Sequence, residues 1–202
     1  MRYVLAAVAL AFLFACGKTM TAAEKTDVSK AMAVGMASST AGSRALQEAA
    51  NIFQRVKRPG GRVDLVDLFC SSSAPAGCSA SCNTLKTVWT LTCTGLSKSY
   101  VCGASTYKLE SGSIKVDLDL VKFLTGTYSL TSTFGGTLSG GTLSGGTLAC
   151  TVATSIDATK VADASKKYDH TVDCSGFSCT YGGASMACAD MQATLGAGGV
   201  CS

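Results

Sequence analysis

The sequence contains little charge, little proline and almost no histidine. Of its 202 residues, 15% are charged, two are proline and one is histidine. The net charge of +4 is too small and too scattered for a protein that binds nucleic acid through phosphate contacts. Because 47% of the residues are apolar, the chain has enough hydrophobic surface to fold rather than remain disordered.

Catalytic motifs are absent as well. The sequence has no G-x-S-x-G nucleophile elbow and no glycine-rich phosphate loop. Its one histidine, His170, lies in KYDHTVD, where strand alternation places Asp169 and Asp173 on the opposite face. No carboxylate nearby in the sequence can therefore orient the imidazole. We predict a protein that is not an enzyme and that needs no cofactor.

Asp117 and Asp119 have the spacing of a catalytic carboxylate pair. They share a strand face and lie about 6.8 Å apart at the standard strand rise, within the range of glycosidase pairs. Lys115 lies on the same face, which the alternation predicts to be exposed to solvent. We interpret these three residues as a solvated face with cross-strand ion pairs.

Long hydrophobic runs are scarce, and the run at the N-terminus is short. Met1-Arg2 precedes thirteen uninterrupted apolar residues, Tyr3 to Ala15. A transmembrane helix needs about 20 such residues, whereas the core of a signal peptide needs about 7–15. Residues 1–15 are therefore predicted to be an export signal, and a polytopic membrane protein is excluded.

The end of this run, Leu13 to Gly17 (LFACG), resembles the lipobox of bacterial lipoproteins. Both have leucine three positions before a cysteine and a small residue directly before it. The resemblance implies that a dedicated peptidase cuts before Cys16. It also implies that the thiol of Cys16 carries a diacylglycerol and that its amine is acylated, with palmitate as a typical chain. Two or three acyl chains give stable membrane attachment, at roughly 0.8 kcal/mol per buried CH₂.

The residues after Cys16 bear on location. In this family, an aspartate directly after the modified cysteine commonly retains the lipoprotein in the inner membrane. The two residues that follow Cys16 here are Gly17 and Lys18, and neither is an aspartate. The resemblance therefore implies the outer membrane of a Gram-negative cell envelope, on its periplasmic or surface face. Plain secretion is the alternative, with cleavage near Thr21-Ala22-Ala23. The resemblance covers residues 1–17 and does not extend to the mature domain.

Ten cysteines remain after Cys16, and an even number in an exported chain predicts disulfides. They are Cys70, Cys78, Cys82, Cys93, Cys102, Cys150, Cys174, Cys179, Cys188 and Cys201. We predict five disulfides, whose pairing the sequence leaves open. The alternative is a metal site at the C-x₃-C and C-x₄-C spacings. Neither is the C-x₂-C form of the best zinc sites, and an export compartment oxidises thiols.

The pattern from Cys70 onward is that of antiparallel strands. Apolar and polar residues alternate through segments such as 114–120 and 128–134. Residues 27–58 instead keep helical spacing, with a break at 38–43. We predict an α+β fold in which this N-terminal helical segment packs on a curved, disulfide-stapled antiparallel sheet, either a partial barrel or a sandwich.

The chain is expected to form one folded unit over residues 27–202. Its parts are a signal peptide at 1–15, a lipidated tether at 16–26, the helical segment at 27–58 and a Cys-rich β domain at 59–202.

Residues 135–149 are an internal repeat, GGTLS-GGTLS-GGTLA. A period of five places successive leucines on opposite faces of a regular strand. Three copies are also too few for a solenoid. We therefore interpret the repeat as a flexible or bulged hairpin segment.

A basic cluster lies at the end of the helical segment. It consists of Arg55, Lys57, Arg58 and Arg62. Cations at a helix C-terminus interact favourably with the helix dipole, by roughly 0.3–1 kcal/mol each. The other interpretation is contact with anionic lipid headgroups beside the anchor.

These observations favour a non-enzymatic, lipid-anchored envelope protein that acts as a binding or structural module. Its expected partners are the membrane, through the acyl chains, and an envelope protein, glycan or lipid ligand of unknown identity. The aromatic residues proposed to anchor such a partner are Tyr100, Tyr107, Tyr128, Phe177 and Tyr181. The alternatives are a carrier of an apolar ligand in a helix-covered half-barrel and an envelope hydrolase.

Overall fold

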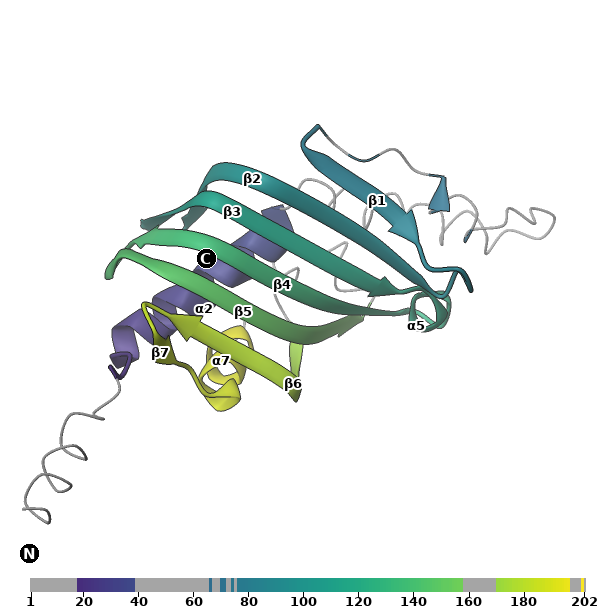
Figure 1. The fold of residues 1–202 in the computed structure, drawn as a ribbon. Helices are drawn as coiled ribbons and strands as arrows, with labels where there is room; N and C mark the ends of the chain where they lie inside the picture. The colour runs from purple at the N-terminus through teal and green to yellow at the C-terminus, as the bar shows by residue number, and fades with distance from the viewer. Residues whose placement is uncertain are drawn as a thin grey trace, which may run out of the picture.

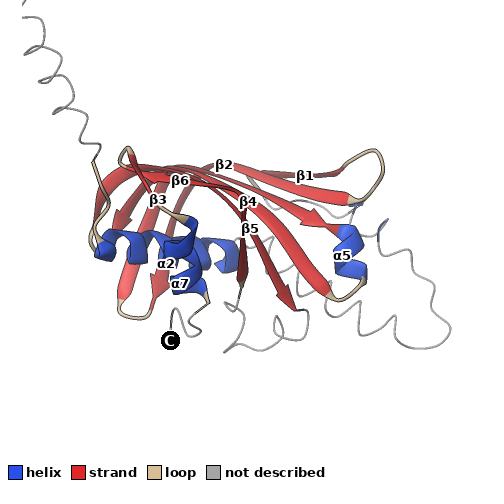
Figure 2. Cartoon of the chain, turned by 90° about the horizontal axis from the view of Figure 1, so that it is seen from below, coloured by secondary structure: helices blue, strands red, loops and turns tan. Residues whose placement is uncertain are grey.

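The computed structural model describes residues 18–38, 66, 70–71, 74, 76–157, 170–196 and 201. The fold is α+β, as predicted: seven antiparallel strands form one curved sheet, and helices lie against its concave face (Figures 1 and 2). The strands follow one another in chain order, and β7 does not pair with β1. The sheet is therefore open and does not close into a barrel.

Long strands joined by short turns make up most of the described chain. The strands are β1 (Cys78–Cys82), β2 (Val88–Cys102), β3 (Ser105–Asp119), β4 (Thr127–Gly140), β5 (Leu143–Asp157), β6 (Thr171–Tyr181) and β7 (Ala184–Ser185). The described helices are α2 (Ala22–Ser38), α5 (Leu120–Leu124) and α7 (Cys188–Leu195). A strand of 15 residues, such as β3, extends for about 50 Å.

Alternation along the strands separates an apolar face from a polar face. One row of directly paired residues crosses five strands on the concave side, and all of its members are buried: Cys93, Ile114, Phe134, Cys150 and Cys179. The next row along points to the convex side and is polar: Thr92, Lys115, Thr133, Thr151 and Ser178. The period of two in the sequence thus places the core on the concave side.

Helix α2 begins earlier than the sequence analysis predicted. It starts at Ala22 rather than at residue 27, so the second half of the expected tether is helical. The reason is a capping box: the Thr21 hydroxyl accepts from the Glu24 backbone N–H at 3.2 Å, and the Glu24 carboxylate accepts from the Thr21 N–H at 2.8 Å. The remainder of the predicted 27–58 segment, from residue 39, lies outside the described residues.

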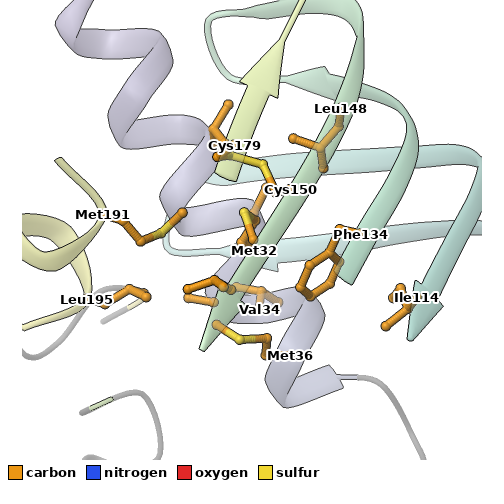
Figure 3. Packing of buried hydrophobic residues seen from close by; sticks show 14 of the residues in the cluster. Met32, Val34, Met36, Ile114, Phe134, Leu148, Cys150, Cys179, Met191 and Leu195 are labelled. Carbon is orange, nitrogen blue, oxygen red and sulfur yellow. A yellow bond between two sulfur atoms is a disulfide. The ribbon is translucent and has the colours of Figure 1, made fainter. Parts of the chain in front are cut away.

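Two helices, α2 and α7, cover the concave face and contact each other. Lys25 of α2 forms an ion pair with Asp190 of α7 at 2.9 Å. Beneath this pair, apolar side chains of both helices and of the sheet meet in one hydrophobic core (Figure 3). Met32, Met191 and Phe134 are members from α2, α7 and β4. The helical layer therefore keeps water from the apolar side of the sheet.

All ten cysteines after Cys16 form disulfides, which confirms the predicted number. The pairs are Cys70–Cys82, Cys78–Cys93, Cys102–Cys201, Cys150–Cys179 and Cys174–Cys188. Two of them join directly paired residues on neighbouring strands, at β1–β2 and β5–β6. The others attach a loop to β1, residue 201 to the end of β2, and α7 to β6.

The GGTLS repeat forms the end of the β4–β5 hairpin. All three leucines, Leu138, Leu143 and Leu148, are buried, although a period of five in regular strands would not place them on one face. The strand register shifts after Leu138, and glycines such as Gly140 and Gly141 have positive φ. These two irregularities turn all three leucine side chains to the same face of the sheet. The bulged interpretation is therefore confirmed.

Gly140 and Gly145 occupy the same position in two copies of the repeat and provide a matched test. Both glycines have positive φ. A Cβ atom added to Gly140 would lie 2.9 Å from Tyr107 Cα, whereas a Cβ atom added to Gly145 would have no neighbouring atom within 4 Å. Gly140→Ala is expected to lower the free energy of unfolding by about 2–4 kcal/mol and Gly145→Ala by about 1 kcal/mol. Denaturant unfolding measures both values, and equal losses would contradict this packing.

Candidate functional site

A buried carboxylate joins α2 to the sheet. Asp27 is 8% exposed. Its Oδ1 accepts from the Tyr107 hydroxyl at 2.6 Å, and its Oδ2 accepts from both the backbone N–H and the hydroxyl of Thr142 at 2.7 Å. Tyr107 belongs to β3, and Thr142 lies in the turn of the GGTLS hairpin. One side chain therefore connects three parts of the fold.

The hydrogen bonds keep Asp27 ionised despite its burial. Burial alone raises the pKa of this carboxyl, but the bonds from Tyr107 and Thr142 outweigh that effect, and Lys30 adds to them, so the pKa is lowered. Burial and the bond to Asp27 together raise the pKa of Tyr107 to about 12. An acid held in its charged form and a phenol held in its neutral form are structural partners rather than a proton-transfer pair.

Tyr181 holds the same hairpin from β6. Its hydroxyl accepts from the Gly146 backbone N–H at 2.9 Å and donates to the Leu138 carbonyl at 3.1 Å. With Asp27 on one side and Tyr181 on the other, polar side chains from distant parts of the chain fix both arms of the repeat and its turn.

Among the described residues, three buried hydroxyls have no hydrogen-bond partner: those of Tyr100, Ser132 and Thr154. The hydroxyls of Ser132 and Thr154 lie together on the concave floor of the sheet. Ser132 of β4 is 1% exposed and Thr154 of β5 is 2% exposed, and neither Oγ atom is bonded. Ser132 is paired with Val152, and Thr154 with Leu130, so the two hydroxyls are diagonal neighbours on one face. Such groups cost about 1–3 kcal/mol each when left unsatisfied.

His170 lies next to this pair of hydroxyls. Thr154 is paired with Val172 on β6, and alternation places His170 on the same concave face as Val172. The imidazole is buried, as Val172 is. Among the described residues, Asp27 is the buried carboxylate, and its oxygens are bonded to Tyr107 and Thr142.

A small apolar cavity lies between α2 and the sheet. Its volume is ≈ 10 Å³, and Met32 and Gly35 of α2 line it together with Phe134, Leu138 and Leu148 of the sheet. A void of this size holds about one water-sized sphere, whereas ligand pockets measure about 300–1,000 Å³. The cavity as described is therefore a packing space rather than a pocket.

The aromatic residues predicted to anchor a partner lie elsewhere than expected. Tyr100, Tyr107, Tyr128 and Tyr181 are all buried, and Phe177 is half-buried against the core. Burial raises the pKa of Tyr128 to about 12, and its ring packs edge-on against Phe123 at 5.0 Å between centroids. Alternation turns the four tyrosine side chains into the core, so none of them lies at the surface of the described fold.

The Asp117–Asp119 pair has the surface role that the sequence indicated. Asp117 accepts from the Thr90 hydroxyl at 2.6 Å and pairs with Lys115 at 2.8 Å. Asp119 caps α5, since its Oδ1 accepts from two backbone N–H groups at 2.9 and 3.0 Å. Neither carboxyl belongs to a buried site.

The cysteine spacings that suggested a metal site belong to disulfides. Cys78, Cys82, Cys174 and Cys179 are each bonded to a different partner. Within the described ranges, no three metal-ligating side chains gather in one place. In the same ranges no helix combines the length and the apolar composition that crossing a membrane requires.

The predicted lipidation site and headgroup contacts lie outside the described residues. They are Cys16, Arg55, Lys57, Arg58 and Arg62. The structure therefore does not bear on either expectation.

Sequence reasoning missed the Asp27 cluster. Its partners, Tyr107 and Thr142, are 80 and 115 residues away along the chain. One signal was present in the sequence. Asp27, three residues after Glu24, lies on a helical segment whose apolar residues face inward, and a carboxylate buried among them needs a hydrogen-bond partner. Comparison with known proteins finds no matching family, no matching curated protein and no matching solved structure.

Asp27→Asn is expected to lower the free energy of unfolding by about 1–3 kcal/mol at pH 7, because an amide cannot accept all three bonds. The loss should depend on pH. Since folding lowers the pKa of Asp27, its ionised form contributes stability above the unfolded pKa of about 3.9, and this contribution is lost as the pH falls through the folded pKa.

Denaturant unfolding of both proteins between pH 7 and pH 2 measures the difference. Asp117→Asn, on the convex face, is the control and should cost less than about 1 kcal/mol. A difference between wild type and Asp27→Asn that stays constant over this range would contradict the assignment.

Proposed function

We propose that the protein is exported, anchored to the cell envelope by acyl chains on Cys16, and acts there as a non-enzymatic binding or structural module. The N-terminal run of thirteen apolar residues and the sequence LFACG support export and lipidation. A location at the outer membrane of a Gram-negative envelope follows from the residues after Cys16.

The pairing of the cysteines is the observation that carries this proposal. The sequence has eleven cysteines, and the five disulfides use ten of them. The eleventh is Cys16, at the position where a lipobox places the modified residue. Oxidised pairs favour a compartment outside the cytosol, which is where a lipoprotein is processed.

The start of α2 is close to the proposed anchor. Five residues lie between Cys16 and Ala22, and an extended segment from one to the other spans about 20 Å. Helix α2 begins at the end of the sheet opposite α5 (Figure 1). The acyl chains would therefore hold the domain against the bilayer by the end that carries the β4–β5 hairpin, and α5 would lie at the far end.

A binding role fits the surfaces and the buried groups better than catalysis does. His170 is buried, but the described carboxylate that is buried, Asp27, has all its bonds within the fold. A hydrolase is therefore the weakest candidate. The carrier alternative is supported by the unpartnered hydroxyls of Ser132 and Thr154 on the concave floor.

Cys16→Ser is expected to abolish lipid attachment, because the modified thiol is absent. Cells that produce the wild-type protein should incorporate labelled palmitate into it and retain it in the membrane fraction. The variant should carry no label and remain in the soluble fraction. Labelling of both proteins, or a soluble wild type, would reject the anchor.

Thiol counting tests the cysteine assignment independently. Alkylation of the denatured, unreduced wild-type protein should modify no cysteine, and alkylation after reduction should modify ten. Reduction should also unfold the domain, since each disulfide of a small exported protein contributes about 2–5 kcal/mol. Two or more thiols that react before reduction would contradict the five pairs.

A further inference from the structure

We propose that the concave floor of the sheet binds the carboxyl head of a long-chain carboxylic acid through Ser132 and Thr154. The inference rests on the proposed binding role and names the class of ligand. It also assigns a function to two of the three buried hydroxyls that the described part of the fold leaves unbonded.

The hydroxyls are the primary evidence. Native proteins satisfy the large majority of buried polar side chains, and a buried group that remains unbonded indicates a missing partner. Ser132 and Thr154 are 1% and 2% exposed, so bulk solvent does not reach either hydroxyl. Two such groups occur side by side, on neighbouring strands and on one face.

The spacing of the pair suits a carboxyl group. Diagonal neighbours across two antiparallel strands lie about 7 Å apart at the backbone, and somewhat less between the Cβ atoms. A carboxyl group offers two oxygens, and a hydroxyl can both donate and accept. One carboxyl can therefore bond both side chains in either protonation state. His170 directly precedes β6, two residues before the Val172 that pairs with Thr154, and adds a buried imidazole near this end of the floor.

The surroundings of the pair are apolar and suit a hydrocarbon chain. Val116 and Val152 flank Ser132 in the register, and Leu130 and Val172 flank Thr154. A polar head on an apolar floor is the arrangement that selects an amphipathic molecule over a fully polar one.

The tail has a direction in which to extend. Along β4, Ser132 is followed on the concave face by Phe134, which Figure 3 shows beside α2, and then by Leu138. Both residues line the cavity under α2. The segment from Ser132 to Leu138 advances by six residue steps and spans about 20 Å, the length of a chain of about sixteen carbons. The cavity is ≈ 10 Å³ and is too small for the chain as it stands, so the proposal requires the second half of α2 to move outward while Asp27 holds the first half.

Binding is measured on the full-length Cys16→Ser protein, purified without detergent. Dodecanoate is titrated while calorimetry and the fluorescence of Trp89, the one tryptophan, are recorded. Trp89 lies in the same transverse row as Thr154, three strands and about 14 Å away. Dodecanol, which has the same chain and no carboxyl group, is titrated in parallel.

The test variant is Ser132→Ala/Thr154→Val, and the matched control is Ser129→Ala/Thr131→Val, which makes the same changes on the convex side of β4. Wild type and control should bind dodecanoate saturably, and the test variant should bind it at least about tenfold more weakly. Dodecanol should bind the wild type about tenfold more weakly than dodecanoate. Without ligand, the Tm of the test variant should equal or exceed that of the wild type.

Three results would overturn the inference: no saturable binding of dodecanoate, equal affinity in the test variant, or a lower Tm of that variant without ligand. The last result would show that the hydroxyls have partners within the fold. Each is independent of palmitate labelling at Cys16. Failure here therefore leaves the anchored module standing, and failure of the anchor leaves the ligand site standing.

Discussion

The carboxylate of Asp27 fixes the helix that covers the concave face of the sheet, and the hydrophobic core depends on that cover. Without α2, much of the apolar side of β2 to β5 would meet water. Hydrophobic attraction is non-directional and does not define where along the sheet the helix lies. The charge-assisted bonds to Tyr107 and Thr142, at 2.6–2.7 Å, do define it, because they have fixed partners and geometry.

Fold class and strand content could be predicted from the sequence because the period of two is a local signal. Alternation at 114–120 is sufficient to assign both a strand and its buried face, and the structure has both in β3 as far as Asp119, while Leu120 begins α5 and is buried there. The number of disulfides was equally accessible, since it requires only a count. The same alternation places Tyr128 on the apolar face with Leu130 and Phe134, where the structure has it, and extended to β3 it would have assigned Tyr107 to the core as well.

The remaining features depend on contacts that no local pattern encodes. The pairing of Cys102 with Cys201, and the bonds from Asp27 to residues far along the chain, arise only when the sheet has formed. In the GGTLS repeat, the period of five predicted alternate facing for regular strands, but glycines with positive φ permit a bulge and a turn that bring every leucine inward. The hydroxyls of Ser132 and Thr154 were hidden for another reason: serine and threonine are ordinary strand residues until their burial is known.

The order of the strands has a consequence for how the molecule is completed. Because the spatial order matches the chain order, each strand adds to an edge that already exists, and the sheet can grow as the chain is synthesised. Cys102–Cys201 is the exception, since it closes a loop across a separation of 99 residues. The cysteine at the end of β2 is synthesised long before its partner, and β3 to β7 and α7 all lie between the two. Cys102 therefore stays a thiol while those elements are made, and its disulfide can form only after every later strand of the sheet has been synthesised.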